Sequence, residues 1–171
     1  MRKALITVAA VCVLLEIGAW GQSKHSVVGT WKLDLSQSDL GSSPKPKSVT
    51  VTILKDTPEM LSWRVHMMDE QGKAISYSWS GPEDGSMHPV MQSGKEIGKQ
   101  SAKRESDGSL TRHGEEPDGS SFDARGKLSD DGKTISEEFN EKSKDGKESK
   151  GKYLYHRVSS AKKSAENPAG A

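Results

Sequence analysis

Apolar and polar residues alternate along most of the chain. Trp31 and Leu33 alternate with polar residues in the segment 27–35, and the segment 48–54 repeats the pattern with β-branched residues. Successive side chains of a β-strand point to opposite faces of its sheet, so this period of two indicates half-buried strands. The period of 3.6 residues that is typical of an amphipathic helix hardly appears. We therefore expect about ten strands and no helix of useful length.

Turn signals separate these strands at short intervals. A polar residue followed by glycine supplies the positive φ angles that tight hairpin turns require. Such pairs occur at Gln71-Gly72, Asp84-Gly85, Asp107-Gly108, Asp118-Gly119, Asp131-Gly132 and Asp145-Gly146. Short strands joined regularly by such turns predict an all-β sandwich or barrel.

The later strands carry a weaker apolar pattern than the early ones. Strands are expected at 61–67, 75–79, 99–105, 110–115, 122–128, 134–140 and 152–158. The segments 99–105 and 110–115 have almost no apolar residues, which indicates either exposed edge strands or strands that depend on their neighbours. The sparse apolar residues of the segment 122–128 predict a bulge near Gly126.

The N-terminus has the pattern of a secretory signal. Arg2 and Lys3 precede the apolar run 4–15, and the small residues Ala19 and Gly21 follow two positions apart. We expect residues 1–21 to be a signal peptide and the mature protein to be extracytoplasmic, either periplasmic or secreted. The apolar run is too short to span a bilayer, so no membrane span is expected.

The rest of the composition restricts the chemistry. Cys12 is the only cysteine and lies in the signal segment, so the mature chain is expected to hold no disulfide and no thiolate metal ligand. The formal net charge is +1, and it falls to zero without Arg2, Lys3 and Glu16. A neutral chain attracts neither nucleic acid nor an anionic membrane. Residues 159–171 have the composition of a disordered tail.

An ordered series of short motifs resembles bacterial secreted lipocalin-like proteins, a largely uncharacterised family with calycin-type barrels. The motifs are the segments 29–34, 39–41, 44–50, 69–77, 84–85 leading to 89–90, 131–136 and 155–158. The resemblance implies a small antiparallel up-and-down barrel with a cavity at one end. We expect about eight to ten strands over residues 27–158 and a monomeric protein. The resemblance also implies that Trp31 closes the barrel floor, that Arg157 lies across its ring, and that Gly29 lets the chain enter closely packed. A guanidinium over an indole is worth about 0.5–2 kcal/mol.

A barrel of this size can hold a small, partly apolar molecule, because its inward side chains need not all meet at the axis. The candidate ligand-binding residues are Trp63, Met67, Tyr77, Trp79, Phe122 and Tyr155. Alternating aromatic residues are equally typical of an ordinary core. If the barrel is filled, the protein is instead expected to be a cell-envelope interaction module that presents a sheet face or edge to another protein.

Catalysis, metal binding and cofactors have little support in the sequence. There is no Gly-x-Ser-x-Gly elbow, and the adjacent carboxylates Glu137 and Glu138 are expected to be solvated surface residues. The groups His66-Met67-Met68 and Met87-His88 with Met91 carry soft donors that suit copper. However, adjacent strand residues face opposite ways, so we expect no metal site, no cofactor and no enzyme activity.

Overall fold

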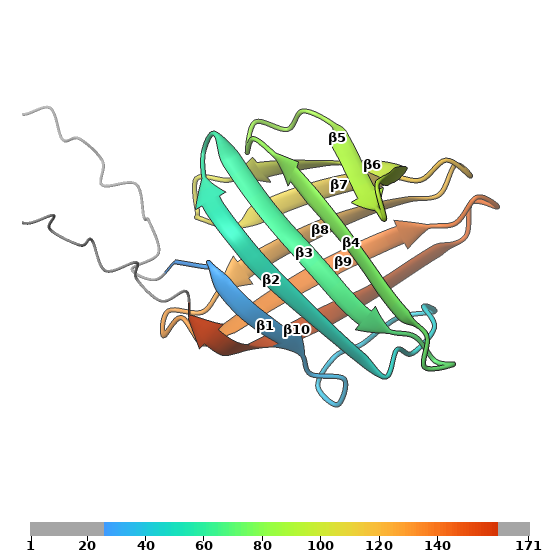
Figure 1. Ribbon diagram of the computed structural model, residues 1–171, viewed down its shortest axis with the longest axis horizontal. Helices are drawn as coiled ribbons and strands as arrows, with labels where there is room; N and C mark the ends of the chain where they lie inside the picture. The colour runs from blue at the N-terminus through green and yellow to red at the C-terminus, as the bar shows by residue number, and fades with distance from the viewer. Residues whose placement is uncertain (1–25, 161–171) are drawn as a thin grey trace, which may run out of the picture.

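The computed structural model describes residues 26–160, and all regular structure in this range is β-strand (Figure 1). The strands are β1 Gly29–Leu33, β2 Ser48–Thr57, β3 Met60–Met68, β4 Ala74–Gly81, β5 His88–Gln92, β6 Lys95–Arg104, β7 Leu110–Glu115, β8 Ser121–Leu128, β9 Thr134–Lys142 and β10 Glu148–Ser160. The prediction of an all-β fold with about ten strands is confirmed. No helix within residues 26–160 is long and apolar enough to cross a lipid bilayer.

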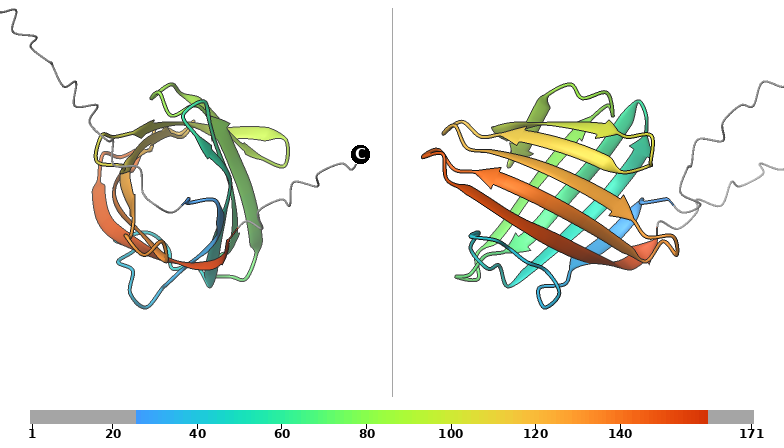
Figure 2. Two further views of the ribbon diagram at one scale, coloured as in Figure 1. Left: turned by 90° about the vertical axis from the view of Figure 1, so that its left-hand side faces the viewer. Right: turned by 180° about the vertical axis from the view of Figure 1, so that it is seen from behind.

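The ten strands form one closed barrel. Each strand pairs antiparallel with the next along the chain, and β1 pairs with β10 to complete the ring (Figure 2). Closure gives every strand a partner on both sides and so removes free sheet edges. The segments 99–105 and 110–115 belong to β6 and β7, which are paired on both sides. The edge-strand interpretation of these two segments was therefore wrong.

Glycines at positive φ make most of the turns between the strands. The six predicted turn glycines have φ between 69° and 89°: Gly72, Gly85, Gly108, Gly119, Gly132 and Gly146. Five of them close tight turns, whereas Gly85 lies in the longer β4–β5 connection and donates from its backbone N–H to the Ala102 oxygen on β6 at 2.9 Å. One further turn, Ser93-Gly94, has φ angles of 49° and 79° and joins β5 to β6. This turn lacks the acidic or amide residue of the others, and the sequence analysis missed both it and β5.

Strand β5 is also the least firmly paired strand. It shares only two residue pairs with β4, namely Ser78 with Met91 and Trp79 with Val90. Pro89 has no backbone N–H to donate, so this five-residue strand can form fewer ladder hydrogen bonds with its neighbours.

The bulge that was predicted near Gly126 does not form in β8. Gly126 pairs in regular register with Leu110 on β7 and Glu137 on β9. Ala124 and Leu128 lie two positions before and after Gly126, so all three residues face the same side of β8. The alternation is therefore unbroken, and Gly126 only interrupts the series of apolar side chains. Register shifts occur instead at Thr30/Trp31, Ile53/Lys55 and Val90/Met91.

The contact between Trp31 and Arg157 joins the first strand to the last. The two residues are direct partners in the β1–β10 ladder, and Trp31 is 1% exposed. Arg157 lies over the indole ring, as the family resemblance implied. Gly29 is buried at φ 141°, a conformation that other residues rarely adopt, so this position requires glycine.

The long connection 34–47 packs against β10, in the part of that strand beyond its pairing with β1. Asp39 and Lys152 exchange two backbone hydrogen bonds of 2.8 Å each. The approach is so close that a Cβ atom on Gly151 would lie 2.4 Å from the carbonyl oxygen of Asp39. The loop 34–47 therefore pairs with the part of β10 that lies beyond the end of β1.

The expectations for the two chain ends lie mostly outside the described residues. The signal peptide at 1–21 and Cys12 are outside that range, as are residues 161–171 of the expected tail. Within it, β10 continues to Ser160, two residues beyond the predicted end of the last strand at Val158.

Candidate functional site

The barrel encloses a cavity of about 590 Å³. Its wall consists mainly of inward-facing aliphatic and aromatic side chains from β2, β3, β4 and the strands opposite them. Five of the six predicted ligand-binding residues belong to this wall: Trp63, Met67, Tyr77, Phe122 and Tyr155. The expectation of a completely filled core is therefore incorrect for this barrel.

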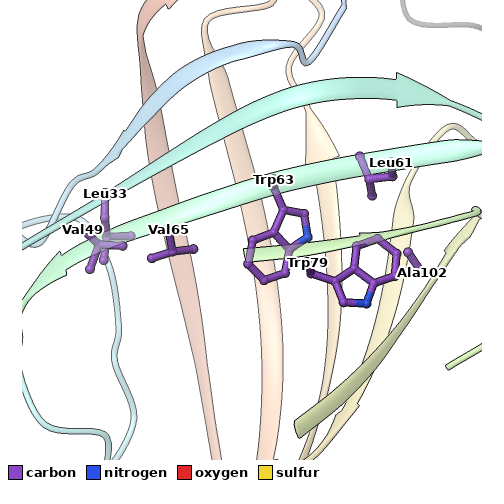
Figure 3. Close-up of a cluster of buried hydrophobic side chains, with 7 residues drawn as sticks. All are labelled: Leu33, Val49, Leu61, Trp63, Val65, Trp79 and Ala102. Atoms are coloured by element: carbon purple, nitrogen blue, oxygen red, sulfur yellow. The ribbon is translucent and has the colours of Figure 1, made fainter. Parts of the chain in front are cut away.

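Trp79, the sixth predicted residue, does not line the cavity. It is 2% exposed, and its indole Nε1 donates to the backbone oxygen of Gln100 at 2.9 Å. Its ring stacks against Trp63 with centroids 6.3 Å apart and an interplanar angle of 21°. Trp79 lies on the same face of β4 as Tyr77, but it belongs to the packed core next to the cavity, with Leu61 and Ala102 (Figure 3).

Trp63 forms the boundary between that core and the cavity. It stacks on Trp79 on one side and meets the edge of Tyr77 on the other, with centroids 5.9 Å apart and rings at 85°. Both offset-stacked and edge-to-face arrangements are favourable for aromatic pairs. The Nε1 atom of Trp63 is buried and has no hydrogen-bond partner among the described residues 26–160. The position of Trp63 is therefore fixed by its ring contacts.

A buried ion pair, which the sequence did not predict, lies in the cavity wall. Nη2 of Arg112 lies 2.7 Å from both carboxylate oxygens of Glu137. Glu137 is 8% exposed, so its expected role as a solvated surface residue was wrong. Ile135 and Phe139 lie two residues before and after Glu137 on the same strand face. This alternation with two apolar residues could have indicated that Glu137 faces the interior.

Small residues on β8 make room for this pair. Arg112 on β7 and Glu137 on β9 are separated by β8, where their ladder partners are Ala124 and Gly126. A Cβ atom on Gly126 would lie 3.5 Å from a carboxylate oxygen of Glu137. Long side chains from the two outer strands can therefore meet over the strand between them.

Further contacts orient the guanidinium of Arg112. Its Nη1 donates to the Gln100 side-chain oxygen at 3.3 Å, and its Cζ lies 5.6 Å from the centroid of Phe122. The ring of Phe122 covers Gly114, because a Cβ atom there would be within 3 Å of the ring. Gln100 is 1% exposed, and its Nε2 has no hydrogen-bond partner within the part of the chain that the structure describes.

The surroundings of the site keep Arg112 charged and the nearby tyrosine hydroxyls neutral. Burial acts to lower the pKa of Arg112, but Glu137 together with Tyr155 and Tyr77 outweighs it and raises the pKa above its ordinary value. Burial raises the pKa of Tyr77, and it raises that of Tyr155 well above the usual value, with Glu137 adding to the shift. Both tyrosines therefore stay protonated at neutral pH. Neither hydroxyl is hydrogen-bonded to another residue in the range 26–160.

A second charged cluster lies at the barrel end that contains the β6–β7 turn. Arg104, which lines the cavity, contacts Asp56 at 2.5 Å and Glu83 at 2.5 Å through Nη2. Burial raises the pKa of Asp56, Arg104 opposes that shift, and the negative charge of Glu83 adds to it. Two carboxylates thus compensate this one guanidinium.

The cavity lining extends to the end of the barrel that contains the β7–β8 turn. Exposed Glu115 and Glu116 belong to its lining there, together with exposed Lys99 from β6. In total, four basic and four acidic residues line the cavity: Lys99, Arg104, Arg112, Lys127, Glu115, Glu116, Glu137 and Glu141. The lining is therefore balanced in formal charge.

Comparison with known proteins identifies no family for this chain. No protein-family model matches the sequence, and no curated protein does. Among solved structures, a de novo designed fluorescence-activating β-barrel is similar over 76% of this chain and 92% of its own, with 14% identity and a TM-score of 0.42. A mutant of the fluorescent protein UnaG is similar over 77% of this chain and 96% of its own, with 12% identity and a TM-score of 0.49.

Proposed function

We propose that this protein binds a small, partly apolar ligand inside the barrel. The observation that carries the proposal is the cavity of about 590 Å³, walled by five of the six residues that the sequence had singled out. Small-molecule sites typically have about 300–1,000 Å³ and mostly apolar linings with a few polar groups. The cavity described above has that size and that composition.

The proposal includes an exported, monomeric protein of the bacterial lipocalin-like type that acts by binding and not by catalysis. Its support is the signal-like N-terminus and the ordered motifs of the sequence. The interior carboxylate of Glu137 already accepts hydrogen bonds from Arg112 through both oxygens, which suits a binding wall better than a general base. The alternative function, a protein-interaction module, was expected for a barrel filled with side chains. The cavity therefore favours ligand binding over this alternative.

Native mass spectrometry of the purified full-length chain tests the proposal. We expect an added mass of one small molecule per chain, which is released when the protein is denatured. Ala124→Phe, which projects a ring into the cavity, should abolish the added mass. Arg125→Phe, the next residue on β8 with an exposed side chain, should leave it in place. Ligand-free protein from several expression hosts, together with no binding of added apolar probes, would contradict the proposal.

A further inference from the structure

We propose that the ligand is an uncharged molecule with a hydroxyl or carbonyl group, and that the Arg112–Glu137 pair and the neighbouring tyrosines bind that group. The inference rests on the proposed ligand binding and specifies the chemical class of the ligand. It excludes a free carboxylate as the group that enters the cavity.

The charge balance of the interior is the first argument. Glu137 compensates Arg112 through both of its oxygens, and Asp56 and Glu83 compensate Arg104. An anionic group that approached Arg112 would also lie beside Glu137, and repulsion between two negative charges is strong where little water screens it. An unpaired charge inside a protein carries a large desolvation cost. The interior cations therefore have no capacity left for an anion.

The exposed lysines do not change this balance. Lys99 and Lys127 also line the cavity, but both are exposed at the surface. Charges in contact with water interact weakly with a ligand and are screened by salt. Glu115 and Glu116 line the cavity at the same end of the barrel as Lys99 and offset its charge.

Unused hydrogen-bonding groups are the second argument. An arginine side chain has five N–H donors. Nη2 serves both oxygens of Glu137 and Nη1 serves Gln100, which leaves the N–H on Nε and at least one further N–H without a partner among residues 26–160. The hydroxyls of Tyr77 and Tyr155, also in the cavity wall, have none in that range. A hydroxyl or carbonyl group can pair with these donors without bringing a charge.

The apolar part of the wall accounts for the remainder of the ligand. The aliphatic residues Val51, Val65 and Ile75 line the cavity together with the rings of Trp63 and Phe122. Apolar surface that leaves water for such a wall is stabilised by roughly 25 cal/mol per Å². The expected ligand is therefore mostly hydrocarbon, with its polar group near the Arg112–Glu137 pair.

Matched probes test this class directly. We would titrate the full-length chain with 1-decanol and with decanoate at pH 7.5, following binding by calorimetry and tryptophan fluorescence. The two probes have the same chain length and differ in charge. We expect the Kd of 1-decanol to be at least about tenfold lower than that of decanoate, because the buried anion is penalised. Equal affinities, or tighter binding of decanoate, would overturn the inference while leaving ligand binding itself intact.

The substitution Glu137→Gln tests whether the pair sets this preference. It leaves Arg112 uncompensated, so the ratio of the two Kd values should shift toward decanoate by about tenfold or more. Glu138→Gln is the matched control, since it makes the same change one residue along β9 on the outer face. If Glu137→Gln fails to fold, the comparison of the two probes on the unmodified chain still decides the matter. If neither probe binds the unmodified chain, the proposed function fails together with the inference.

Discussion

The guanidinium carbon of Arg157 lies 4.1 Å from the centroid of the Trp31 ring, at the junction where the last strand meets the first. Arg157 does more than cover the ring. Its Nε donates to the Gly132 oxygen at 2.7 Å, and its Nη1 donates to the Val28 oxygen at 3.0 Å. One side chain therefore ties together β1, β10 and the β8–β9 turn.

This contact predicts a graded loss of stability on substitution. Arg157→Ala removes the cation–π contact and the carbonyl hydrogen bonds, so the free energy of unfolding should fall by about 2–4 kcal/mol. Arg157→Lys keeps a cation over the ring but loses the planar fork, and it should cost about 1–2 kcal/mol. Urea unfolding followed by tryptophan fluorescence measures both. A loss below about 0.5 kcal/mol for Arg157→Ala would show that the contact does not hold the barrel closed.

Gly151 and Gly126 provide a matched pair of glycines inside strands. A Cβ atom on Gly151 would lie 2.4 Å from both the Asp39 oxygen and the Phe139 ring, so Gly151→Ala must push the loop 34–47 away from β10. We expect it to lower the free energy of unfolding by about 1–3 kcal/mol. Gly126→Ala meets nothing closer than 3.5 Å and should change stability by less than about 1 kcal/mol. Similar losses in thermal or urea unfolding for the two variants would contradict this packing.

Trp79 and Trp63 distinguish the core from the cavity wall. Trp79→Phe loses the hydrogen bond to Gln100, so we expect about 1–2 kcal/mol less stability. Probe affinity should change by less than about twofold, because the ring does not line the cavity. Trp63→Ala removes part of the wall and should weaken binding of 1-decanol by about tenfold or more. If Trp79→Phe weakens binding as much as Trp63→Ala, the assignment of Trp79 to the core is wrong.

The barrel was predictable where local chemistry is distinctive. Glycine after a polar residue often adopts positive φ in a hairpin turn, and five of the six predicted turns form as tight turns, with Gly85 the exception. Alternation placed Trp63 and Tyr77 on the inner face, but it could not tell wall from core, because both kinds of position have the same phase. Trp79 faces inward like Tyr77, and only the three-dimensional packing of β6 beneath it separates the two.

The polar interior was not predictable from the same pattern. A charged residue at an inward position looks like solvated surface in a sequence, since burial of charge depends on a partner elsewhere. Arg112 and Glu137 are 25 residues apart, and they meet because Ala124 and Gly126 on the strand between them are small. Only the register of three strands brings these four positions together. The same lack of apolar residues made β7 look like an edge strand.

His113 gives a prediction for the pH dependence of stability. It faces outward from β7, and its Nδ1 lies 2.8 Å from the Asp123 carboxylate on β8, with Glu115 at 3.4 Å from Nε2. The hydrogen bond to Asp123 raises the pKa of His113 above its ordinary value of 6.5. A base whose pKa is raised on folding stabilises the folded state when it is protonated. Its contribution is complete below the unfolded pKa and disappears as the pH rises through the folded value.

The comparison of wild type with His113→Gln isolates this contribution. At pH 5.5 the variant should be less stable by about 0.5 kcal/mol, a small value because the ion pair is exposed to solvent. At pH 9 the two proteins should have the same free energy of unfolding. Asp123→Asn should reduce the difference at pH 5.5, since it removes the main cause of the raised pKa. Urea unfolding at the two pH values measures the effect, and a difference that grows with pH would have the wrong sign for a protonated His113.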